Sequence, residues 1–170
     1  MLHATAIALY RGGTWCAALL QGPSGAGKSD LALRAMAAGW RLVADDRVVA
    51  WASGGRLFGR APATLSGLVE ARGLGVLTAP PLGLAQIVLA VELIGSPDAV
   101  ERAPEPAQVE IHGVRLRHIK LFPQESSAVA KLALALQAAP LGAGAEEAYQ
   151  TRSHGRGQSA HRVVGASHEE

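Results

Sequence analysis

Residues 22–29 have the types and spacing of a site that holds phosphate groups. Their sequence, GPSGAGKS, fills every fixed position of the pattern G-x-x-x-x-G-K-[ST], which is typical of phosphate-binding loops. Glycines let the backbone approach an anion closely, so that successive N–H groups surround it. Lys28 would place a positive charge near the outer phosphates, and Ser29 would offer a hydroxyl oxygen to Mg²⁺. The pattern therefore predicts a nucleoside triphosphate site. The residues of this phosphate loop are Gly22, Pro23, Ser24, Gly25, Ala26, Gly27, Lys28 and Ser29.

Two adjacent carboxylates, Asp45 and Asp46, follow the apolar run 41–44 and could serve the same reaction. Phosphoryl transfer needs an acidic group that holds a metal ion and a group that positions or deprotonates the attacking oxygen. In a nucleotide-binding sheet the carboxyl ends of neighbouring strands open on one crevice, so the end of this run and the phosphate loop should meet. An acidic turn before Arg47 is the alternative interpretation, and the position of the pair favours the catalytic one.

The segments on either side of the phosphate loop are those that such a loop needs. The apolar run 15–20 is typical of a buried strand, and residues 29–38 have a helical composition that ends at Gly39. A strand, a loop and a helix in this order place the positive end of the helix dipole on the phosphates. A glycine-rich turn that matched the pattern by accident would lack this context.

The rest of the chain mixes extended runs, turn residues and one further helical pattern. Glycine pairs at 12–13 and 54–55 separate extended runs and predict two hairpins. The expected strands cover residues 3–10, 14–20, 41–44, 48–52, 56–60, 86–94 and parts of 110–121, and the expected helices cover 29–38 and 126–139. Hairpins combined with helices predict an α/β fold with a mixed, partly antiparallel sheet.

Composition limits the architecture and the partners. A chain of 170 residues is typical of one domain, and with 49% apolar but only 4% aromatic residues its core must consist of Ala, Val, Leu and Ile. Sixteen basic residues against 14 acidic ones give a net charge of +2 without a basic block, which argues against a nucleic-acid partner. Cys16, the single cysteine, excludes an internal disulfide and a cysteine-based metal cluster.

The sequence also predicts where the protein works and how it is divided. No apolar run reaches the roughly 18 residues of a membrane helix, because Glu92 interrupts the longest candidate at 86–94. The first residues lack the basic lead of an export signal, so we expect a soluble cytoplasmic protein with no membrane partner. Periodicity ends near residue 140, so we expect a catalytic domain over 1–140 and a flexible tail over 141–170, whose histidines lack metal-site spacing.

Four stretches together resemble one family. They are His3, the phosphate loop followed by Asp30, the run RLVADDRV over 41–48, and the run VEARGLG over 69–75. In order and spacing they are similar to the catalytic domain of HPr kinase/phosphorylase, the bacterial enzyme that modifies a serine of the phosphocarrier protein HPr. The resemblance covers about residues 3–138. It implies a single phosphate-loop domain of the HPr kinase C-terminal or PEP carboxykinase-like fold, with ATP and Mg²⁺ as cofactors.

The resemblance implies a catalytic role for each matching residue. Asp45 would be the general base that takes the seryl proton, and the acid when phosphoserine is attacked by inorganic phosphate in reverse. His3 would lie behind Asp45 and orient it, and Asp46 would be a supporting carboxylate. Lys28 would act on the transferred phosphate.

It also implies ligands for the metal and the nucleotide. Glu70 would join Ser29 around Mg²⁺, and Arg72 with its neighbouring glycines would shape the loop beside them. Arg102 falls where the family keeps a phosphate-binding arginine, and an ordinary exposed arginine is the alternative.

Two departures from the family pattern change what we expect. Long members carry a separate N-terminal domain; because this sequence begins almost at the catalytic domain, we expect the short alphaproteobacterial form, which it resembles. In place of their segment Pro-Val-Arg-Pro-Gly-Arg-Asn, residues 121–127 read LFPQESS. The loss of two arginines weakens the expectation of the reverse, phosphorylase reaction and of a hexamer, and leaves open whether the protein forms a homo-oligomer.

We therefore expect an ATP- and Mg²⁺-dependent protein serine kinase that acts on an HPr-like phosphocarrier. A small-molecule kinase with the same loop is one alternative, although an arginine-rich lid segment is not evident. An ATP-binding regulatory module without phosphotransfer is another. The presence of both Asp45 and Glu70 favours phosphoryl transfer over nucleotide binding alone.

Overall fold

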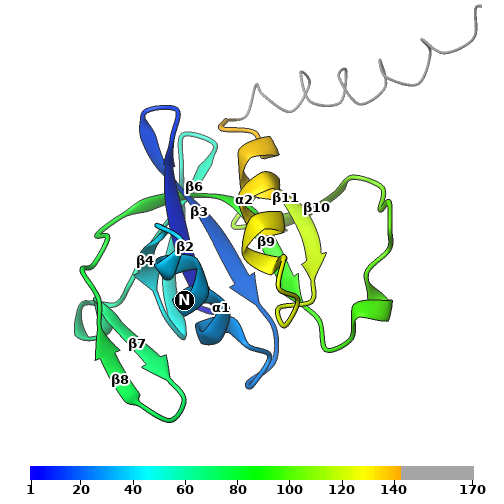
Figure 1. Cartoon of the computed structure of the whole chain (residues 1–170). Coiled ribbons are helices and arrows are strands. Elements are labelled where there is room, and N and C mark those ends of the chain that lie inside the picture. Colours follow the sequence, from blue (N-terminus) through cyan, green and yellow to red (C-terminus); the bar gives the residue numbers. More distant parts are fainter. Residues whose placement is uncertain (143–170) are drawn as a thin grey trace, which may run out of the picture. The chain divides into compact units, whose positions relative to one another are not determined.

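The computed structural model describes residues 1–142, and the elements lie within the compact unit Met1–Ala139. In these residues eleven strands and two α-helices are present, together with two short 3₁₀ helices, η1 (Ala63–Leu65) and η2 (Pro97–Ala99) (Figure 1). The strands are β1 (Leu2–His3), β2 (Thr5–Arg11), β3 (Thr14–Gln21), β4 (Arg41–Ala44), β5 (Arg47–Ser53), β6 (Arg56–Arg60), β7 (Leu68–Ala71), β8 (Gly75–Thr78), β9 (Ala85–Leu93), β10 (Ala107–Ile111) and β11 (Val114–Leu121). The α-helices are α1 (Lys28–Ala37) and α2 (Ala128–Ala138).

Nine of the described strands form one mixed sheet, with the path β1-β5-β6-β9-β3-β2-β4 and the pair β10-β11 joined to β9. Strand β9 runs parallel to β3 and β11 and antiparallel to β6. Its near-continuous apolar sequence matches this position, because such a strand is covered on both faces. The mixed, partly antiparallel α/β fold predicted from the hairpins is confirmed.

Strand β2 determines which segments meet at the site. It lies between β3 and β4 and is antiparallel to both, so β3 and β4 point the same way and their carboxyl ends reach one edge of the sheet. The amino end of β2 lies at that same edge, where Thr5 pairs with Leu20 and Ala6 with Ala44. The phosphate loop, the aspartate pair and the start of β2 therefore converge.

The hairpin turns form where glycine pairs allow them. Gly12 and Gly13, between β2 and β3, have φ angles of 57° and 83°, which a two-residue hairpin turn of the primed type requires.

The adjoining Arg11 guanidinium donates hydrogen bonds to the carbonyl oxygens of Leu136 and Ala139, the latter at 2.6 Å. Because the last carbonyls of a helix have no partner within it, this contact fixes the C-terminus of α2 against the hairpin.

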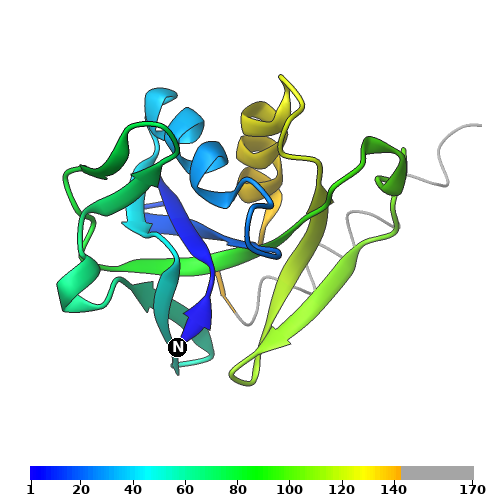
Figure 2. The same ribbon diagram turned by 90° about the horizontal axis from the view of Figure 1, so that it is seen from below.

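Both helices pack on the same face of the sheet (Figure 2). The core between them and the sheet consists of small and branched apolar side chains, as the low aromatic content predicts.

Cys16 is fully buried in β3, and burial raises the pKa of its thiol above the ordinary 9.0, against the lowering effect of the Arg11 charge. Within residues 1–142, no helix has the length and apolar character to cross a membrane.

Two features differ from the sequence-based expectation. The expected strand over 3–10 is divided in two. Residues of β1 pair with β5, whereas β2 begins at Thr5 and lies in the ladder with β3. Residues 68–78 form a separate two-stranded hairpin, β7-β8, that projects from the main sheet (Figure 1). The expected tail over 141–170 lies almost entirely outside the described residues, and the boundary at 140 stays a prediction.

Candidate active site

The phosphate loop leads from the end of β3 directly into the N-terminus of α1. Gly27 precedes the helix with φ 89°, and no side chain caps the first turn. A Cβ atom at Gly27 would lie 3.3 Å from Cγ of Pro123, so the backbone is in close contact with the segment before α2. The N–H groups of an uncapped first turn, at the positive end of the helix dipole, form a ready anion site.

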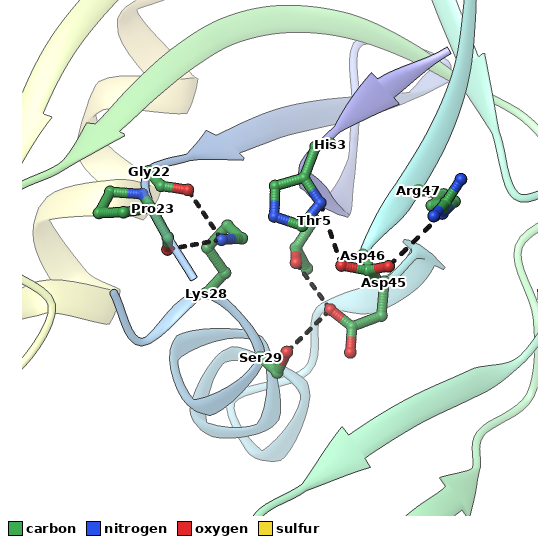
Figure 3. Close-up of polar contacts among 9 residues, drawn as sticks. All are labelled: His3, Thr5, Gly22, Pro23, Lys28, Ser29, Asp45, Asp46 and Arg47. Carbon is green, nitrogen blue, oxygen red and sulfur yellow. Dashed lines mark hydrogen bonds and ion pairs between the residues drawn. The ribbon is translucent and has the colours of Figure 1, made fainter. Parts of the chain in front are cut away.

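Lys28 lies folded over the loop that carries it. Its side-chain Nζ donates hydrogen bonds to the carbonyl oxygens of Gly22, at 2.8 Å, and Pro23, at 2.9 Å (Figure 3). The residue is 8% exposed, which is low for a lysine. The ammonium group is thus held at the phosphate loop and next to the uncapped helix end.

Asp45 is buried and accepts hydrogen bonds from different parts of the fold. Its Oδ1 accepts from Oγ1 of Thr5 at 2.7 Å and from Oγ of Ser29 at 3.0 Å (Figure 3). Its Oδ2 accepts from the backbone N–H of Glu70 at 3.1 Å. The carboxylate therefore joins β2, the first turn of α1 and β7, and its orientation is fixed by all of them.

Asp46 has a different environment from its neighbour. Asp46 has φ 62°, in the left-handed region. The residues on either side of it form a tight turn, in which the backbone N–H of Arg47 donates a hydrogen bond to the carbonyl oxygen of Asp45 at 2.7 Å. Its exposed carboxylate pairs with Nδ1 of His3 at 3.1 Å and lies 3.7 Å from Nε of Arg47. The tight turn thus directs the two adjacent side chains to different partners (Figure 3).

The position of His3 corrects one expectation. From the sequence, His3 should lie behind Asp45, whereas its ion-pair partner is Asp46. The reason is the β1-β5 pairing, in which His3 is opposite Arg47 and so reaches the residue next to it. Thr5 takes the place beside Asp45 instead.

One cavity of about 740 Å³ brings most of the predicted site together. The predicted residues that line it are His3, Ser24, Gly25, Gly27, Lys28, Ser29, Asp45, Asp46, Glu70 and Arg72. Gly22, Pro23 and Ala26 belong to the same loop, the first two through the carbonyl groups that hold Lys28. Arg102 is exposed on the segment between η2 and β10 and does not line the cavity.

Two polar lining residues, Thr5 and Gln124, were missed by sequence reasoning. Thr5 is two positions after His3, and alternate residues of an extended segment face the same way, so the spacing could have indicated it. Gln124 lies between β11 and α2, and its position follows only from the tertiary fold. Arg34 of α1 fixes that segment by donating to the carbonyl oxygen of Pro123, while it pairs with Asp30 at 3.0 Å.

The fold and the site define the class of protein. It is a mixed α/β domain in which a glycine-rich loop and the uncapped end of a helix share a cavity with a buried carboxylate. Residues 1–135 match the family model for the HPr Serine kinase C-terminal domain, and the chain belongs to this family.

Two curated relatives agree with this assignment. The chain is 40% identical over 94 residues to HPr kinase/phosphorylase of Clostridium tetani, covering 55% of this chain and 30% of that protein. It is 30% identical over 131 residues to HPr kinase/phosphorylase of Streptococcus thermophilus, covering 71% of this chain and 41% of that one. The chain thus spans well under half the length of these curated relatives.

The fold is also similar to that of the HPr(Ser) kinase/phosphatase from Coxiella burnetii. The TM-score is 0.67 at 19% sequence identity, and the match covers 92% of this chain and 98% of the solved one. At this level of identity the likeness concerns the arrangement of helices and strands.

Proposed function

We propose that the chain is a protein serine kinase that transfers the γ-phosphoryl group of ATP to an HPr-like phosphocarrier protein. One observation carries the proposal. The buried carboxylate of Asp45 accepts a hydrogen bond from Ser29 of the phosphate loop, in the cavity that Lys28 also lines. A nucleotide held by the loop would therefore have its outer phosphates beside both a cation and a carboxylate.

The residues of the cavity fit ATP and Mg²⁺. The uncapped first turn of α1 and the Lys28 ammonium suit phosphate oxygens. Mg²⁺ is commonly bound through one or two carboxylates, a hydroxyl and the substrate phosphates, a set that Ser29 and Glu70 can supply with the nucleotide. When bound, the metal ion would neutralise charge that develops on the transferred phosphoryl group.

The chain's own groups account for the proton. As the seryl oxygen forms its bond to the γ-phosphorus and the bond to the bridging oxygen of ADP breaks, Asp45 takes the seryl proton. The hydrogen bonds from Thr5, Ser29 and Glu70 N–H hold this carboxylate in one orientation. Positioning of this kind is the main contribution a protein makes to phosphoryl transfer.

The wall of the cavity favours a protein over a small molecule as the substrate. Leu74 and Val76 of the β7-β8 hairpin line the cavity, yet they are 76% and 65% exposed. Apolar side chains exposed at the edge of a site are typical of protein-binding surfaces, whereas a small substrate is mostly enclosed. The reverse reaction and the phosphate-binding role of Arg102 stay predictions.

Transfer of radiolabel tests the proposal. Purified protein, γ-labelled ATP, Mg²⁺ and an HPr-like protein should yield labelled phosphoserine on the carrier. Asp45→Asn should abolish transfer and leave ATP affinity within about threefold. Asp98→Asn, on the exposed helix η2, is the matched control and should transfer at the unaltered rate.

Other outcomes assign other functions. Label on a metabolite would identify a small-molecule kinase, and ATP binding without transfer would identify a sensor. If Asp46→Asn rather than Asp45→Asn abolishes transfer, the His3–Asp46 pair accepts the proton. Equal loss of ATP–Mg²⁺ binding and of transfer in Asp45→Asn would assign this carboxylate to the metal.

A further inference from the structure

We propose that Thr5 is a positioning residue that holds Asp45 in the orientation needed for proton transfer, an inference that rests on the proposed kinase function. Its hydroxyl donates to Oδ1 of Asp45 at 2.7 Å, the shorter of the two hydroxyl contacts that this oxygen receives. Thr5 is fully buried, and its side chain reaches Asp45 from a strand that lies between two others.

The two hydroxyl donors to Oδ1 differ in what else they must do. Ser29 stands on the first turn of α1, in the phosphate loop, where its oxygen is also the proposed ligand for Mg²⁺. Thr5 belongs to the strand ladder, where it pairs with Leu20, and its branched side chain has restricted χ1 freedom. Thr5 can therefore keep its bond to Asp45 while Ser29 engages the metal.

Burial makes the hydrogen bond between Thr5 and Asp45 energetically important. A hydroxyl with no water around it loses a partner outright when its acceptor turns away, so Thr5 favours the one carboxylate rotamer that it can reach. Further along the same side of β2 the alternate residue is the buried, apolar Ile7. The Thr5 hydroxyl thus lies at the end of β2 that contacts Asp45. Packing alone would need only an apolar side chain at this position, so the hydroxyl serves the hydrogen bond.

A short variant series tests the inference. Thr5→Val keeps the branched shape and removes the donor, so kcat should fall about tenfold or more while KM for ATP stays within about twofold. Thr5→Ser restores the hydroxyl and should recover kcat to within about threefold of the unaltered protein. Thr14→Val, at the opposite end of β3 from the phosphate loop, is the matched control and should leave kcat unchanged.

A readout independent of activity accompanies the kinetics. The side-chain ¹³Cγ resonance of Asp45, assigned with Asp45→Asn, should shift in Thr5→Val, return in Thr5→Ser and stay in place in Thr14→Val. Circular dichroism verifies folding, and Thr5→Ala replaces Thr5→Val if the latter does not fold. Absence of phosphoryl transfer by the unaltered protein would contradict the kinase proposal. The ¹³Cγ resonance of Asp45 would still decide whether Thr5 orients this carboxylate.

Two results would overturn the role of Thr5. One is a folded Thr5→Val or Thr5→Ala variant with kcat within twofold of the unaltered protein. The other is a loss of kcat that Thr5→Ser fails to recover, which would trace the effect to packing. An unmoved Asp45 resonance in the folded variant would exclude the positioning role by itself.

Discussion

Two neighbouring aspartates illustrate how one turn gives the same side chain two environments. Asp45 is 6% exposed and surrounded by donors, whereas Asp46 faces His3 at the surface of the cavity. Asp46 has a left-handed backbone in the tight turn after β4, and its side chain pairs with His3. A buried carboxylate held by several donors and an exposed carboxylate paired with a histidine therefore lie side by side.

At the residue scale, Lys28→Met should weaken ATP binding by about 10-fold or more. The change removes a charged donor to phosphate, and hydrogen bonds to charged groups contribute about 1.5–3 kcal/mol. Isothermal titration with a non-hydrolysable ATP analogue measures the loss. Lys131→Met, on α2 where the lysine pairs with Glu125, is the control and should bind the analogue with unchanged affinity. Equal affinities in the two variants would contradict a phosphate-binding role for Lys28.

At the element scale, most helices and strands could be predicted because their signals are local. The hairpin at Gly12 and Gly13, the strand that ends before Asp45 and the helix after the phosphate loop each follow from residues within a few positions of one another. The sequence also predicted that the phosphate loop and the aspartate pair meet, and they do so because β3 and β4 point the same way on either side of β2.

What sequence reasoning missed depends on pairings between distant segments. The partner of His3 is set by the β1-β5 ladder, and nothing near His3 in the sequence indicates that ladder. The contacts of Thr5 with Asp45 and of Pro123 with Gly27 likewise join segments far apart in the chain. The spacing from His3 could have indicated that Thr5 faces the site, but its partner Asp45 follows only from the sheet order.

The close contact at the start of α1 leads to a second prediction. Gly27→Ala should lower the free energy of unfolding by about 1–2 kcal/mol, because a left-handed backbone disfavours a side chain. The added Cβ would also press on Pro123, so ATP affinity should fall as the loop shifts. Urea unfolding and nucleotide titration measure the two effects. Gly83→Ala, where a Cβ has open space, is the control and should change neither quantity.

The β7-β8 hairpin yields a third prediction. Leu74→Ser combined with Val76→Thr should raise KM for the carrier protein at least about fivefold, because less apolar surface is buried on contact. The KM for ATP should stay within twofold. Leu134→Ser, at an exposed position of α2, should leave both values unchanged. A double variant with an unaltered KM for the carrier would assign the docking surface elsewhere.

At the scale of the whole molecule, β9 holds the sheet together. It pairs with β3 along one edge and with β6 and then β11 along the other, and most of its side chains are buried. The strand that carries the phosphate loop is therefore supported on both sides, by β2 and by β9.

Leu89→Ala in β9 should accordingly lower the free energy of unfolding by about 2–5 kcal/mol, the range for a large core side chain reduced to Ala. Thermal or urea unfolding measures the change. Labelling of the buried Cys16 thiol should become faster in this variant, since openings that expose β3 become more frequent. Leu134→Ala, whose leucine is 67% exposed, should differ from the unaltered protein by less than about 0.5 kcal/mol.

The parallel ladder between β3 and β9 also has a consequence for the order in which the fold can form during synthesis. A nascent chain that has left the ribosome as far as the aspartate pair already contains the whole GPSGAGKS run, but one flank of β3 is still bare. Until residues 85–93 emerge and pair with β3, the phosphate loop lacks the support of this strand. Excised fragments that end before β9 should therefore make poor nucleotide-binding modules, however complete their motif.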